Sequence, residues 1–197
     1  MAATGQPGRV EVLLRRRMEL LPSDGSIPRF VYHEAAELDA GGAAALVKRA
    51  AGAARKAARA GVEEILDELR RLNVTVEAVG VPTGSTKVPA DLAAVLRAHP
   101  LIHAAEGQLI QQAVSEACDA CGLEVVTGRE RDLWPMAAEA HGVTAAALRQ
   151  GLDDLRKILG PPWSADQKIA TAAALWALGE CRTTAGRRGG SRGHSRN

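Results

Sequence analysis

The chain has 197 residues, of which 46% are hydrophobic and 24% are charged, a length and composition that suit one globular domain with a real core. No segment approaches the roughly 18 consecutive apolar residues of a membrane helix, and residues 1–8 have neither the charged nor the apolar region of a signal peptide. We therefore expect a cytoplasmic protein with no membrane partner.

The charge is unevenly distributed along the chain. Residues 181–197 contain five arginines and no acid, so the rest of the chain is mildly acidic although the net charge is +2. Residues 186–197 have no apolar side chain whose burial could offset the entropy of ordering, and we predict a disordered basic tail over 181–197 after a single domain over 1–180. Such a tail is either simply solvated or contacts nucleic-acid phosphates through Arg187, Arg188, Arg192 and Arg196.

The cysteines number three and include one C-x-x-C pair. An odd number without an export signal argues against a disulfide framework. Cys118 and Cys121 form the pair, but they lie inside a predicted helix with no second pair of ligands. The spacing rules for metal and redox sites therefore disfavour such a role here.

The N-terminal part is predicted to form a hairpin and then a long helix. Two apolar runs, 10–21 and 27–38, flank an Asp24-Gly25 turn. The Ala-rich segment 42–72 carries apolar residues near helical spacing, which predicts one long helix or two helices broken near Gly61. Its small side chains suit close packing on a sheet.

The middle of the chain alternates strands with helices. Residues 74–81 and 123–127 are predicted strands, separated by helices over 91–97 and 100–121, with Gly122 as a helix stop. The loop 82–89 lacks the glycine and lysine order of a phosphate-binding loop. Helices over 135–141, 144–159 and from Ser164 onward complete an α/β fold.

Two acidic residues near helix starts fall on apolar stripes. Glu106 lies one turn after Ile102 and three residues before Leu109, and Asp166 shares a helical face with Ala173. An unpaired buried charge is costly, so Glu106 either reaches water at the edge of its stripe or is held for a purpose. For Asp166 the alternative is a structural role, because an acid in the first turn complements the helix dipole.

The order of elements resembles the ribonuclease H-like fold, and the chain is most similar to RuvC-type Holliday-junction resolvases. The resemblance is carried by 130–133, by 141–144 and by 161–166, where Asp166 stands in the position of a metal-binding Asp at the start of the final helix. It implies a mixed sheet, an N-terminal hairpin plus parallel strands, flanked by helices. It also implies metal-dependent phosphodiester hydrolysis with Mg²⁺ or Mn²⁺ held by clustered carboxylates.

The chain departs from that family at several positions. The family's first strand with its Asp is missing, Trp163 falls where a second Asp is expected, and no basic residue lies in 135–148. Glu77 lies in the middle of its predicted strand, which leaves Glu106 on the next helix as a displaced substitute. Residues 4–8 look like the turn after a first strand, so we expect an apolar strand ending in Asp to be encoded upstream of Met1.

Two hypotheses follow from these features. The first is a metal-dependent nuclease in which Glu106 and Asp166 are the catalytic, metal-binding acids, lying close together at one end of the sheet, with His103 as a second-shell partner one turn from Glu106. The second is a non-catalytic ribonuclease H-like domain that binds nucleic acid or a protein partner. The absent first acid favours the second hypothesis for this chain, whereas the acids on apolar stripes favour the first. Whether the chain is an enzyme, and whether it is a homodimer, stays open.

Overall fold

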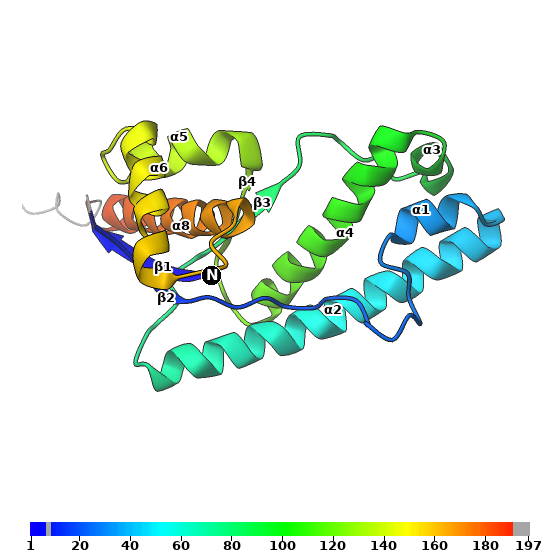
Figure 1. Ribbon diagram of the computed structural model, residues 1–197, viewed down its shortest axis with the longest axis horizontal. Helices are drawn as coiled ribbons and strands as arrows, with labels where there is room; N and C mark the ends of the chain where they lie inside the picture. The colour runs from blue at the N-terminus through cyan, green and yellow to red at the C-terminus, as the bar shows by residue number, and fades with distance from the viewer. Residues whose placement is uncertain (7–8, 191–197) are drawn as a thin grey trace, which may run out of the picture. The chain divides into compact units, whose positions relative to one another are not determined.

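The computed structural model describes residues 1–6 and 9–190 (Figure 1). The chain is α/β, as predicted, with helices predominating over small sheets. It divides into two compact units where the sequence predicts one domain. The first unit contains Met1–Arg16, Val76–Pro82 and the chain from Glu124 onward, and the second contains Arg17–Thr75 and Thr83–Leu123.

The first unit holds two small sheets and a group of helices. Its strands are β1 (Ala2–Gln6), β2 (Arg9–Leu14), β3 (Val79–Thr83, whose last residue belongs to the second unit) and β4 (Val125–Arg129). Its helices are η1 (Glu130–Asp132), α5 (Leu133–Ala140), α6 (Ala145–Asp154), α7 (Arg156–Leu159) and α8 (Ala165–Gly190). β1 and β2 pair antiparallel, and β3 and β4 form a parallel pair. The described strands therefore form two separate two-stranded sheets rather than one mixed sheet.

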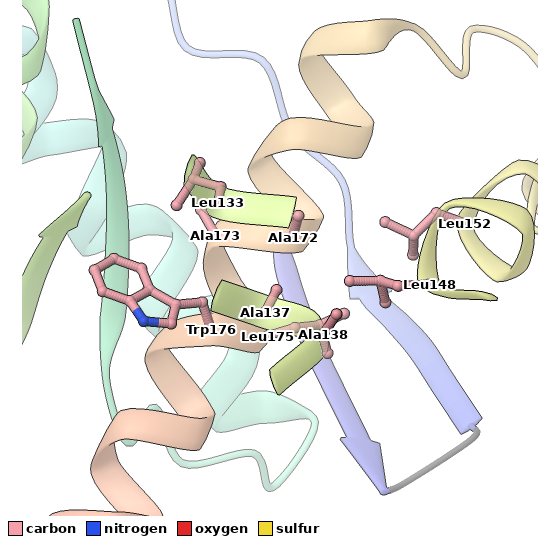
Figure 2. Close-up of a cluster of buried hydrophobic side chains, with 9 residues drawn as sticks. All are labelled: Leu133, Ala137, Ala138, Leu148, Leu152, Ala172, Ala173, Leu175 and Trp176. Atoms are coloured by element: carbon pink, nitrogen blue, oxygen red, sulfur yellow. The ribbon is translucent and has the colours of Figure 1, made fainter. Parts of the chain in front are cut away.

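The core of the first unit lies between α5, α6 and α8. Figure 2 shows the buried side chains that these helices contribute, among them Leu133, Leu152, Leu175 and Trp176. The buried indole of Trp163 also has a hydrogen-bond partner: its Nε1 donates to the Leu152 carbonyl oxygen over 2.6 Å. A capping box at Ser164 and Gln167 begins α8, as predicted.

The second unit is helical. It consists of α1 (Val31–Ala36), α2 (Ala40–Arg71), α3 (Leu92–Leu96) and α4 (His99–Ala120). α2 is one unbroken helix, and at Gly61 an added Cβ would lie 2.6 Å from the Met18 sulfur, so that glycine makes room for Met18. The alanines of α2 face α4, not a sheet as predicted, because the small side chains allow another helix to approach equally well. Gly122, at φ +74°, ends α4 as expected.

The predicted hairpin over 10–21 and 27–38 is wrong. β2 pairs with β1, and the second apolar run contributes α1 instead. Asp24 makes a local turn by accepting a hydrogen bond from the Ser26 backbone N–H over 2.9 Å. Residues 4–6, which the sequence suggests are part of a turn after a missing strand, belong to β1.

Part of the C-terminal segment that the sequence predicts to be disordered is helical in the structure. The backbone of α8 is helical to Gly190, which takes in Arg187 and Arg188 of the predicted disordered tail. Arg192 and Arg196 lie outside the described residues.

Among the helices that the structure describes, none has the length and apolar character needed to cross a membrane.

Candidate metal centre

Glu106, on α4, is bound to the start of α1. Its carboxylate accepts backbone N–H groups from Val31 over 3.1 Å, from Tyr32 over 2.7 Å and from His33 over 3.3 Å. These are N–H groups of the first helical turn, which have no carbonyl partner within the helix. The side chain of Glu106 is 18% exposed, so its charge is compensated by these donors more than by water. Of the two alternatives for Glu106, the structure favours an acid held in place by specific partners.

The same carboxylate also contacts an imidazole. Nδ1 of His33 lies 3.3 Å from Oε1 of Glu106, so both carboxylate oxygens have partners. Burial and the neighbouring Glu106 charge raise the pKa of the Tyr32 phenol above its ordinary value. Glu106 therefore places a negative charge beside Tyr32 and His33. The contact between its carboxylate and the His33 ring favours the tautomer in which Nδ1 carries the hydrogen.

Three histidines gather beside this carboxylate. His99 and His103 are one turn apart on α4, and their ring centroids lie 4.4 Å from each other. The ring of His33, from α1, lies 4.7 Å from that of His103 and 5.5 Å from that of His99. One nitrogen of each ring can be chosen so that all three lie within 4.8 Å of one another. His99 and His103 are exposed and His33 is half-buried.

This cluster is suited to a transition metal. Neutral imidazole nitrogens bind Zn²⁺ at about 2.0–2.1 Å, which in a tetrahedral site places two ligand atoms about 3.3 Å apart. The three nitrogens lie within 4.8 Å of one another, and the exposed rings of His99 and His103 can rotate to adjust these separations. A carboxylate that accepts the other ring N–H of a ligand is a common second partner in such sites, and Glu106 has that position relative to His33.

In the structure, the contacts of His103 and Glu106 suit roles at the site other than the predicted ones. The sequence predicts Glu106 as a metal ligand and His103 as its second-shell partner, whereas the geometry makes His103 a candidate ligand and Glu106 the partner of another ligand. His99 and His33 were not predicted at all. The H-x-x-x-H spacing of His99 and His103 is the local signal for this site, because it places both rings on one helical face.

Asp166 is not part of this cluster. It belongs to the first unit, whereas Glu106 belongs to the second, so the predicted shared site stays a prediction. The expectation that Asp166 lies on the buried stripe is wrong, because its side chain is exposed and burial on α8 begins further along the helix, at residues such as Ala172 and Ala173. An acid in the first turn of α8 complements the helix dipole.

The cysteines do not add to the candidate centre. None of them forms a disulfide within the described residues, and burial raises the pKa of the Cys118 thiol to about 11. A thiol with so high a pKa is a poor metal ligand and a poor nucleophile at neutral pH. Within the residues described, the three histidines are the one group of metal-ligating side chains that lies close enough to hold an ion.

No protein-family model, curated protein or solved structure matches this chain. The resemblance to ribonuclease H-like proteins therefore remains an expectation from the sequence.

Proposed function

We propose that this protein binds one divalent transition-metal ion, such as Zn²⁺, through His33, His99 and His103. The observation that supports this most strongly is the convergence of three imidazole rings from two helices at one end of the second unit. Nitrogen ligands favour Zn²⁺, Cu²⁺, Ni²⁺ and Co²⁺ over Mg²⁺, which prefers oxygen ligands.

Glu106 supports the proposal in a second way. Because Nδ1 of His33 faces the Glu106 carboxylate, Nε2 is the nitrogen left to bind a metal. The same carboxylate holds the first turn of α1, which carries His33. Glu106 therefore acts as a positioning residue for one ligand while α4 itself positions the other two.

The test is metal binding by the full chain. One Co²⁺ ion per chain should bind and give the visible absorption of a four-coordinate site with nitrogen ligands. Zn²⁺ should displace the Co²⁺. His99→Ala and His103→Ala should each weaken Zn²⁺ binding at least tenfold, while His194→Ala, which removes a histidine that is not one of these three ligands, should not. Circular dichroism shows whether the variants remain folded. Wild-type affinity in both cluster variants would refute the proposal.

The nuclease hypothesis is retained as a second proposal on the resemblance at Asp166. It predicts Mg²⁺- or Mn²⁺-dependent cleavage of branched DNA that is lost in Asp166→Asn and unaffected by His99→Ala. The geometry argues against a direct metal role for Glu106, because both of its oxygens already accept hydrogen bonds. The non-catalytic alternative predicts nucleic-acid binding without cleavage under the same conditions.

A further inference from the structure

We infer that the histidine centre is catalytic and hydrolyses anionic phosphodiesters with a metal-bound water. This inference rests on the proposed metal binding and adds an activity and a substrate class to it. It is carried by the number of protein ligands, by their exposure and by a cationic side chain, Arg29, that lies over the ring next to His33.

The described part of the chain supplies three ligands to the cluster and no fourth. Structural zinc sites usually close with four protein ligands, whereas catalytic ones keep a position for water. Glu106 does not close the site, because its carboxylate is bound to the N–H groups of Tyr32 and His33 and to the ring of His33.

His99 and His103 are exposed, and the side chain of His33 is 31% exposed. A metal ion held by these rings would therefore face solvent on its fourth side. Water can occupy that position, and a substrate can reach it without an opening motion of the second unit.

Phe30, which directly precedes α1, is 57% exposed, and its ring centroid lies 5.7 Å from that of His33. The guanidinium of Arg29 stands 5.6 Å from the Phe30 ring centroid, and within the described residues it forms no ion pair. The Phe30 ring therefore neighbours both the Arg29 guanidinium and the ring of His33. A metal ion attracts an anion, and a guanidinium on the adjoining segment matches the oxygens of a phosphate group.

The reaction follows from these positions. A metal ion held by His33, His99 and His103 would lower the pKa of a bound water, which would then lose one proton to solvent and could attack phosphorus as hydroxide. The new bond would join phosphorus to the hydroxide oxygen, and the bond to one ester oxygen would break. That oxygen would leave with the electron pair and take up a proton from solvent. Water and a diester thus give a monoester and an alcohol, with no oxidation or reduction.

The experiment measures turnover of two chromogenic esters by the Zn²⁺-loaded full chain. Bis(p-nitrophenyl) phosphate is the anionic probe, and p-nitrophenyl acetate is the neutral one. The phosphodiester should be hydrolysed above the rate of Zn²⁺ in buffer, and His99→Ala should reduce this rate to that background. Arg29→Gln should lower kcat/KM for the phosphodiester about fivefold to tenfold and leave the acetate unaffected. Arg49→Gln, an exposed arginine on α2, is the matched control and should change neither rate.

The outcomes separate this inference from the proposed function. Stoichiometric Zn²⁺ binding with no turnover of either ester would overturn the inference and leave the metal site standing. Equal losses for both esters in Arg29→Gln would overturn the substrate class. An absence of metal binding would overturn the proposed function itself, and the inference with it.

Discussion

Gly80 is the position at which the packing of the first unit can be tested most directly. It lies in β3 against α8, where an added Cβ would stand 2.2 Å from the carbonyl oxygen of Ala173 and 2.6 Å from the carbonyl carbon. Ordinary contacts of this kind begin near 3.4 Å, so strand and helix would have to separate by more than an ångström. Both clashing atoms belong to helix backbone and cannot rotate away.

Overpacking of this kind typically costs about 1–3 kcal/mol, and a backbone clash falls at the upper end. We therefore expect Gly80→Ala to lower the free energy of unfolding by about 3 kcal/mol. Gly151→Ala is the matched control, because Gly151 lies in helix α6 with nothing within 4 Å of its added Cβ. Alanine should stabilise that helix by about 0.5–1 kcal/mol.

Tryptophan fluorescence during urea unfolding is the assay that isolates this unit. The chain contains three tryptophans, Trp134, Trp163 and Trp176, and all of them lie in the first unit. With a urea slope of about 2 kcal/mol per molar, the transition of Gly80→Ala should move down by about 1.5 M. An unchanged midpoint in Gly80→Ala would show that β3 does not pack on α8 as described.

Two further predictions concern the thiols and the basic C-terminal segment. Because burial raises the pKa of Cys118 to about 11, iodoacetamide at pH 7.5 should modify it at least tenfold more slowly in the folded chain than in urea, as measured by mass spectrometry of peptides. The same shift stabilises the fold fully below the ordinary thiol pKa of 9.0, and this contribution should be lost as the pH rises toward 11. Replacing Arg187, Arg188, Arg192 and Arg196 by Gln should weaken salt-sensitive binding to single-stranded nucleic acid and reduce the slope of log affinity against log salt by up to about 3. Unchanged binding and slope would remove the tail from any nucleic-acid role.

Elements whose signals are local could be predicted from the sequence. The capping box at Ser164, the stop at Gly122 and the helical period of α2 each depend on residues within a few positions of one another. α1 could not be predicted in this way, because its first turn is completed by Glu106, 75 residues from Val31. From local signals alone, an apolar run beside an Asp-Gly turn favours a hairpin. The contact with the distant Glu106 carboxylate stabilises a helix there instead.

Glu106 shows how far the same reasoning extends to the site. A carboxylate on an apolar stripe must find hydrogen-bond donors or a cation, so its position in the sequence predicts that it has specific partners. The type of partner is not predictable from the stripe, because backbone N–H groups, a metal ion and a basic side chain would all satisfy the charge. Here the donors are the first N–H groups of α1, and that contact brings His33 to His99 and His103. The acid that the sequence singled out therefore assembles the candidate metal centre without being one of its ligands.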